Sequence, residues 1–291
     1  MVLNIALRME CEKNMPMILM YITNDTNVAR IAEKNGVDRI WIDLETLGKE
    51  ERQKNMDCVK SHHTINDIKI MSKVLTSSEL MVRINPWNIN SKREIEDVIS
   101  AGAQRIMLPM WKTSKEADEF LRFVNQRTAT TLLLETKEAV ECIDNVLRNP
   151  LLDEIHIGLN DLHLSYNMEF MFELLTNGVV ENLCRKMDSA GIKYGFGGIA
   201  QIGTGTLPAE KILIEHYRLK STRVILSRGF CKMTDEDTMQ TFAEKFAKNM
   251  KQFRSYERIV RGLTNNDYIS NHKDIGKIIN TILEKQGVCH V

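Results

Sequence analysis

Two carboxylates stand where apolar runs of the chain come to an end. Glu135 follows Leu132-Leu133-Leu134, and Asp161 falls near the end of the apolar run 155–162. Such runs are typical of strands in a parallel sheet that is buried on both faces. Two hard oxygen ligands, with the remaining positions left to water and substrate, suit an octahedral Mg²⁺ or Mn²⁺ ion. The pair therefore predicts a divalent-metal site, and with it a metal-dependent lyase for 2-oxo acids or related enolisable acids.

Further polar residues interrupt the other apolar runs at the same relative position. They are Asp43, Glu45, Arg83, Asn85, Asn160, Ser227 and Arg228. The carboxyl ends of barrel strands share one face, so we expect these side chains to converge there. Arg83 could hold a substrate carboxylate through two hydrogen bonds. The metal would then stabilise an enolate or oxyanion forming at C2 of the substrate. No lysine ends a strand, which argues against an aldolase that forms a lysine imine.

A second candidate site surrounds the seventh and eighth expected strands. Gly197 and Gly198 lie in a glycine-rich strand, and Ser227 and Arg228 follow the next strand. Barrels often place an anion site after these two strands, so this group could bind a phosphate or a distal carboxylate of the substrate. The alternative is that the glycines only permit close packing.

The strand-end residues also have structural interpretations. Asp43 and Arg83 could simply pair as a salt bridge under the barrel rim, and Glu135 and Asp161 could cap loops. Three histidines are expected to play no chemical part. His156 alternates with apolar strand residues and is predicted to be a hydrogen-bonded core residue, whereas two others lie in a polar stretch and are expected to be solvated: His62 and His63.

Eight strand–helix alternations position these residues along the chain. The expected strands cover residues 17–22, 39–45, 80–85, 105–110, 132–136, 155–162, 194–199 and 223–227. Their spacing of ~25–35 residues is that of βαβ units, and a chain of 291 residues suits one barrel with extensions. The prediction is an α/β fold, a TIM (β/α)₈ barrel with a helical C-terminal extension. Residues 1–253 would form the catalytic barrel with a short N-terminal extension. Residues 254–291 would form a helical tail, either a surface helix or an arm on a neighbouring subunit.

Composition excludes several classes of partner. The 39 basic and 39 acidic residues balance, so we expect neither nucleic acid nor an anionic membrane surface as a partner. No apolar run approaches the ~20 residues of a membrane span. The 6 cysteines are scattered without a zinc-site spacing, which favours reduced thiols and a cytoplasmic location. The expected partner is a small-molecule 2-oxo acid or acyl substrate.

Five short motifs occur in order along the chain. They are Ile42-Asp43-Leu44-Glu45, Val82-Arg83-Ile84-Asn85-Pro86, Gly102-Ala103-x-x-Ile106-Met107-Leu108-Pro109, Leu134-Glu135-Thr136 and Ile157-Gly158-x-x-Asp161-Leu162. Over residues 17–232 the chain resembles the class II pyruvate aldolases and citrate lyase beta subunits, the HpcH/HpaI aldolase family. The resemblance implies a TIM barrel, a divalent metal held by Glu135 and Asp161, and Arg83 binding the carboxylate of pyruvate or an acyl substrate. It also implies a homo-oligomer, often with a C-terminal helix exchanged between subunits.

Two positions depart from the pattern of that family. In the aldolase branch a histidine follows the glutamate of the second strand and serves as acid–base, and in the citrate lyase branch an aspartate stands there. This chain has Thr46. In addition, Gly158-Leu159-Asn160-Asp161 replaces the proline usual in the aldolase version. The base would then be Glu45, Asp43, a metal-bound water, or nothing.

Three functions follow from these residues. The first is a metal-dependent carbon–carbon lyase or aldolase that releases or uses pyruvate or another small enolisable acid. In this function Arg83, Glu45 and Asp43 act in catalysis, and the substrate contacts a wider group: Arg83, Asn160, Gly197, Gly198, Ser227 and Arg228. The second is a citrate-lyase-type lyase or hydrolase acting on acyl-CoA thioesters. The third, favoured by Thr46, is a barrel that has lost catalysis and serves as a binding or assembly subunit.

Overall fold

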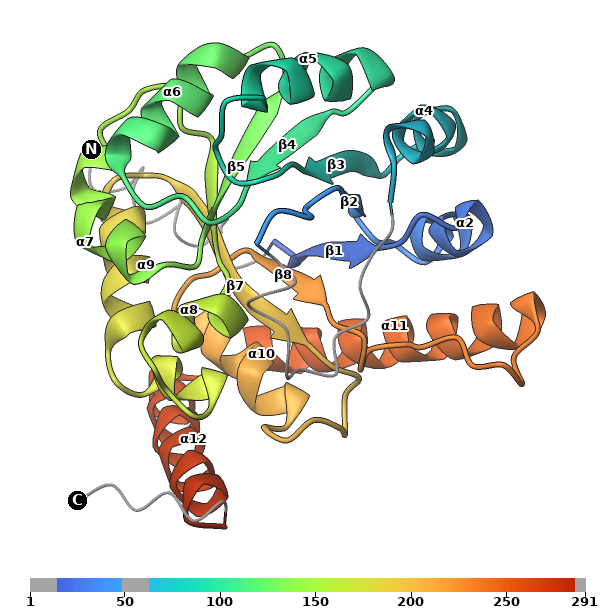
Figure 1. The fold of residues 1–291 in the computed structure, drawn as a ribbon. Helices are drawn as coiled ribbons and strands as arrows, with labels where there is room; N and C mark the ends of the chain where they lie inside the picture. The colour runs from blue at the N-terminus through green and yellow to red at the C-terminus, as the bar shows by residue number, and fades with distance from the viewer. Residues whose placement is uncertain (1–14, 49–62, 286–291) are drawn as a thin grey trace, which may run out of the picture.

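Eight parallel strands close into a barrel in the computed structural model, which describes residues 15–48 and 63–285 (Figure 1). Each strand pairs with its neighbours in chain order, and β8 pairs with β1. The strands are β1 (Ile18–Ile22), β2 (Arg39–Asp43), β3 (Glu79–Arg83), β4 (Arg105–Leu108), β5 (Ala129–Leu134), β6 (Glu154–Ile157), β7 (Lys193–Ile199) and β8 (Arg223–Leu226). The predicted TIM barrel is confirmed.

Helices follow the strands and surround the barrel, as Figure 1 shows. They are α2 (Thr26–Lys34), α4 (Ile65–Val74), α5 (Ser91–Ala101), α6 (Ser114–Val124), α7 (Lys137–Val146), α8 (Leu159–Ser165), α9 (Val179–Ser189), α10 (Ala209–Arg218), α11 (Met239–Arg261) and α12 (Asn265–Lys285), with a short 3₁₀ helix, η1 (Met171–Leu175). Hydroxyl side chains fix some of the helix starts: Thr64 and Thr113 cap α4 and α6 with reciprocal capping boxes. Among the described helices, none has the length and apolar character needed to cross a bilayer.

Side-chain alternation along the strands divides the core into two parts. One cluster contains Met20, Trp41, Met81, Met107 and Leu133 from β1 to β5, and the larger cluster packs the strands against the helices. Successive side chains of a strand point to opposite faces, so the residue two positions later points to the same side. The strands β2, β3 and β5 thus continue, on the side of the smaller cluster, into Asp43, Arg83 and Glu135.

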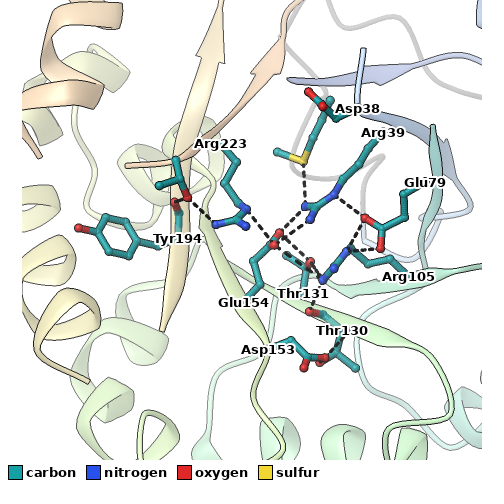
Figure 2. Close-up of polar contacts among 12 residues, drawn as sticks. Asp38, Arg39, Glu79, Arg105, Thr130, Thr131, Asp153, Glu154, Tyr194 and Arg223 are labelled. Carbon is teal, nitrogen blue, oxygen red and sulfur yellow. Dashed lines mark hydrogen bonds and ion pairs between the residues drawn. The ribbon is translucent and has the colours of Figure 1, made fainter. Parts of the chain in front are cut away.

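An ion-pair cluster closes the other, N-terminal end of the barrel (Figure 2). Glu154 is 1% exposed and pairs with Arg39 at 2.7 Å and with Arg223 at 2.9 Å. Arg105 joins it through Glu79, with Nε 3.0 Å from Oε2. Burial alone would raise the pKa of Glu154, but the surrounding arginines lower it to about 2. These charges satisfy one another, so this end of the barrel contributes to stability.

The C-terminal helices pack on the outside of the barrel and confirm the predicted helical extension. The last helix, α12, lies against α10: Lys211 Nζ is 3.0 Å from Asp274 Oδ2, and Asn271 Nδ2 donates to the Lys211 carbonyl at 3.0 Å. A further contact joins His272 Nδ1 to Glu215 Oε1 at 2.9 Å. Glu215 is fully buried, so this contact fixes α12 to the wall of its own chain.

Candidate active site

A buried ion pair forms where β2 and β3 end. Arg83 lies opposite Asp43 in the strand register, and its Nε and Nη2 each donate to a different oxygen of that carboxylate at 2.8 Å. Nη2 also lies 3.2 Å from Glu45 Oε2, and the guanidinium is 5.0 Å from the centre of the Trp41 ring. The predicted salt bridge between Asp43 and Arg83 is therefore present. Among the described residues, none forms a hydrogen bond with Nη1 of Arg83.

At the end of β5, the Glu135 carboxylate accepts a backbone hydrogen bond on one side and lies close to Gly158 on the other. Its Oε1 accepts the backbone N–H of Met110 at 3.1 Å, and the side chain is 3% exposed. Met110 has φ +53°, a conformation that non-glycine residues rarely adopt and that is found at functional sites. On the other side, a Cβ atom at Gly158 would lie only 2.7 Å from Oε2. The lack of a side chain at Gly158 leaves room for the carboxylate.

The surroundings of Glu135 are strongly anionic. Burial raises the pKa of Glu135 well above its usual range, and the nearby Asp161 carboxylate raises it further. Arg83 lowers this pKa and Glu45 raises it. The structure thus brings Glu135 close enough to Asp161 for mutual repulsion, which a shared divalent cation would relieve.

These two carboxylates fit a magnesium or manganese ion. Mg²⁺ is usually bound through one or two carboxylates and keeps several waters. No set of three or more His, Cys, Asp or Glu side chains within residues 15–48 and 63–285 could hold a metal. Protein ligands beyond Glu135 and Asp161 are not needed for this kind of site. The residues present suit an ion whose other positions are filled by water and substrate.

Asp161 lies on a helix rather than on the strand that its apolar surroundings predicted. The strand β6 ends at Ile157, Gly158 is the N-cap of α8, and Asp161 falls in the first turn of that helix. The continuous apolar run is explained by burial, because Leu159 and Leu162 face the core from α8. A carboxylate in the first turn is also favoured by the helix dipole.

Thr46 stands where the family resemblance implies an acid–base residue, and its contacts are those of a structural residue. Its backbone N–H and hydroxyl donate to Asn85 Oδ1 at 2.9 and 3.2 Å, and the N–H of Leu47 donates to the same oxygen at 3.0 Å. The amide nitrogen of Asn85 in turn donates to Glu94 at 2.8 Å. Thr46 is exposed, and Asn85 fixes the turn that follows β2.

His63 is a residue of this rim that sequence reasoning missed. It was expected to be solvated, yet it is half-buried and its Nδ1 accepts the backbone N–H of Asp43 at 2.9 Å. The capping box that starts at Thr64 was the available signal, because it places His63 at the start of a helix. His62 lies outside the described residues. His156 is a core histidine as predicted: it is fully buried and its Nε2 bonds to the Gly197 carbonyl at 3.0 Å.

The second candidate site is partly assembled. A Cβ atom at Gly198 would lie 3.4 Å from the Ser227 side chain, so the ends of β7 and β8 are in contact. Gly197 has φ +53°, and a Cβ there would lie 2.7 Å from Leu159, so close packing is one reason for this glycine. The remaining residue of this group, Arg228, is exposed, as is Asn160, the other predicted substrate contact. Binding of an anion by this group stays a prediction.

Comparisons with known proteins agree with this architecture. Residues 17–170 match the family model described as HpcH/HpaI aldolase/citrate lyase. Similar solved structures include a family protein of that description from Burkholderia cenocepacia, with a TM-score of 0.58 and 14% identity over 76% of this chain and 92% of that one. An HpcH/HpaI aldolase from Desulfitobacterium hafniense has a TM-score of 0.57 and 16% identity over 81% and 93%.

A third similar structure contains ligands. Protein CitE from Mycobacterium tuberculosis, in complex with magnesium and pyruvate, has a TM-score of 0.54 and 13% identity over 80% of this chain and 98% of that one. At such low identities the structural likeness shows the fold. No curated protein matches the sequence.

Proposed function

The chain belongs to the HpcH/HpaI aldolase/citrate lyase family, and from this membership and its strand-end geometry we propose that it is a divalent-metal-dependent carbon–carbon lyase or aldolase acting on 2-oxo acids. The observation that carries the proposal is the buried Glu135 carboxylate, which has Asp161 beside it and Arg83 within its field. The magnesium and pyruvate bound to the similar protein CitE support the same chemistry.

Each residue of the rim has a part in this chemistry. Glu135 and Asp161 would hold Mg²⁺ or Mn²⁺, and the bound ion supplies Lewis-acid polarisation of the 2-oxo group. Arg83 binds the substrate carboxylate from its Nη1 side, because Nε and Nη2 already bond to Asp43 and Glu45. The fixed guanidinium orients the acid, so binding costs little reorganisation.

Glu45 is the better candidate for moving the proton. Both carboxylate oxygens of Asp43 are already engaged by hydrogen bonds of 2.8 Å from Arg83. Glu45 has one longer contact to the same guanidinium, at 3.2 Å. In the cleavage direction the substrate is a 4-hydroxy-2-oxo acid. Glu45 takes the proton of the C4 hydroxyl, the C3–C4 bond breaks, and the electron pair of that bond forms the enolate. The aldehyde leaves, and protonation of C3 gives the 2-oxo acid.

Exchange of the pyruvate methyl protons with solvent deuterium tests the proposal. Enolisation needs no acceptor aldehyde, so proton NMR with Mn²⁺ kept at a low level, or with Mg²⁺, should show loss of the methyl signal. We expect exchange to cease in Glu135→Gln and to persist in Glu138→Gln, an exposed residue in the first turn of α7. Both variants should fold. Full exchange after removal of metal by a chelator would contradict the proposed function.

A citrate-lyase-type reaction on acyl-CoA thioesters is a second candidate. The Arg83-Ile84-Asn85-Pro86 stretch resembles the lyase branch of the family, whereas residues 106–110 resemble the aldolase branch. CitE is also known with magnesium and acetoacetate. Turnover of thioesters but not of free acids would favour this function.

An inactive barrel would neither bind Mn²⁺ at millimolar levels nor exchange pyruvate protons.

We further propose a cytosolic homo-oligomer. Within the described residues Cys142, Cys184 and Cys231 are free thiols, as is usual in a reducing compartment. Within residues 254–291, α12 packs on α10 of its own chain, so the region would contribute its outer surface to a second subunit. Light scattering of the full chain and of a chain that ends at residue 262, and so lacks α12, would test this contribution.

A further inference from the structure

The backbone N–H of Asp43 donates to a side chain and not to the carbonyl of a neighbouring strand. Along β2 the amides alternate in direction: the N–H of Leu44 points to β3 and donates to the Arg83 carbonyl at 2.9 Å. On the β1 side, Thr23 donates to the Trp41 carbonyl at 3.2 Å, but β1 has already ended at Ile22. Asp43 is 2% exposed, so water cannot easily replace a missing acceptor.

His63 supplies this acceptor through its side chain. The distance from the Asp43 nitrogen to His63 Nδ1 is 2.9 Å. A backbone amide can only donate, so Nδ1 must carry a lone pair, and the neutral ring carries its proton on Nε2. Nδ1 is therefore engaged as an acceptor and is not available to take a proton from a substrate.

The ring is held in place by the start of a packed helix. Thr64 follows His63 and accepts the N–H of Asp67, while the Asp67 carboxylate accepts the N–H of Thr64 at 2.6 Å. The helix α4 that begins there is anchored by Ile68 and Met71, both fully buried. His63 thus directly precedes the N-cap of a packed helix.

We propose that His63 is a positioning residue for the Arg83 carboxylate-binding group and acts on it through Asp43. The imidazole fixes the backbone at Asp43, and the Asp43 carboxylate in turn holds Nε and Nη2 of Arg83 at 2.8 Å each. This leaves Nη1 directed to the substrate. The proposal rests on the proposed function in one respect, namely that Arg83 binds the carboxylate of a 2-oxo acid.

Two substitutions separate the acceptor from the rest of the ring. His63→Asn keeps an acceptor, because the amide oxygen of asparagine can take the place of Nδ1, whereas His63→Leu removes it. We expect His63→Leu to raise KM for the 2-oxo acid roughly 10-fold with kcat and Mn²⁺ affinity within about 2-fold of wild type. His63→Asn should restore KM. His272→Leu, a change in α12 on the outside of the barrel, serves as control and should leave KM and kcat unchanged.

Amide hydrogen exchange at Asp43 gives a readout that needs no substrate. It should be faster in His63→Leu than in wild type and should return to the wild-type rate in His63→Asn. Unchanged exchange in His63→Leu would overturn the proposal even if the enzyme were active. A fall in kcat at constant KM, without rescue by asparagine, would also overturn it and make His63 a proton carrier. If the wild-type protein binds no 2-oxo acid, the proposed function fails, and the exchange rates still decide whether His63 fixes Asp43.

Discussion

Replacing Gly158 by alanine tests the metal site by steric means alone. This residue has φ −83° and ψ 90°, which alanine adopts without strain, so the backbone need not change. The added Cβ would lie 2.7 Å from Glu135 Oε2, 3.0 Å from Glu135 Cβ and 3.3 Å from a methyl group of Leu133. The variant therefore pushes directly on the proposed metal ligand and changes no charge.

The size of the effect follows from how far the carboxylate must move. Ordinary van der Waals contact begins at 3.4 Å, so Oε2 must shift by about 0.7 Å. Glu135 is 3% exposed and its other oxygen is held by Met110, so it cannot swing into solvent. Mg²⁺ and similar ions require oxygen ligands at ~2.0–2.1 Å, and misplaced ligands typically cost about 10–100-fold in metal affinity. The clash should also destabilise the fold by about 1–3 kcal/mol.

Manganese titration and urea unfolding measure the two effects separately. We expect Gly158→Ala to bind Mn²⁺ about 10–100-fold more weakly, by calorimetry or electron paramagnetic resonance, while remaining folded. Gly276→Ala is the matched control, because nothing lies within 4 Å of its added Cβ and it sits in the interior of α12. That variant should bind Mn²⁺ normally and gain about 0.5–1 kcal/mol of stability. Wild-type Mn²⁺ affinity in Gly158→Ala would refute the assignment of Glu135 as a ligand.

Two further predictions concern the stability of the barrel. Glu154→Gln should lower the free energy of unfolding in urea by about 3 kcal/mol at pH 7, because the pKa of Glu154 falls from its ordinary 4.5 to about 2 in the folded protein. Glu79→Gln, at a more exposed position, should lower the free energy of unfolding by less. Equal losses in the two variants would contradict the central role of Glu154. Burial lowers the pKa of His156 to about 4 in the folded protein. As pH falls, His156 of the unfolded chain is protonated near pH 6.5, whereas His156 of the folded protein is protonated only near pH 4. The stability due to neutral His156 is then complete above pH 6.5 and should decline by about 3 kcal/mol toward pH 4. His156→Gln should lack this part of the pH dependence, and the same slope in both proteins would exclude His156 as its source.

Strand alternation is the reason that much of the rim could be predicted from the sequence. Asp43, Arg83 and Glu135 each stand two residues after an inward-facing apolar side chain, so the strand period alone directs them to one end of the barrel. The same reasoning misplaced Asp161. An apolar run of eight residues is compatible with a strand or with a strand followed by a buried helix, and only packing against the barrel distinguishes the two.

The contact of His63 could not be predicted, for a different reason. Its partner is a backbone amide, and a backbone amide leaves no mark in the amino-acid sequence. The need for an acceptor arises only because β1 ends at Ile22 while β2 continues to Asp43, which depends on how the two strands are staggered in the closed barrel. The capping box at Thr64 predicts where a helix begins, but not which strand that helix start will touch.

The two ends of the barrel differ in how their charges are balanced. At the N-terminal end the arginines and glutamates pair with one another, and the pKa of Glu154 is low because each neighbouring charge favours its ionised form. At the C-terminal end Arg83 pairs with Asp43 and Glu45, and the pKa of Glu135 is raised by burial and by Asp161. A carboxylate whose pKa is raised by burial and by a second carboxylate is destabilised in its charged form, which a cation bound beside it would reverse. A divalent ion between Glu135 and Asp161 would offset the repulsion between these two carboxylates and leave Arg83 to bind an acid.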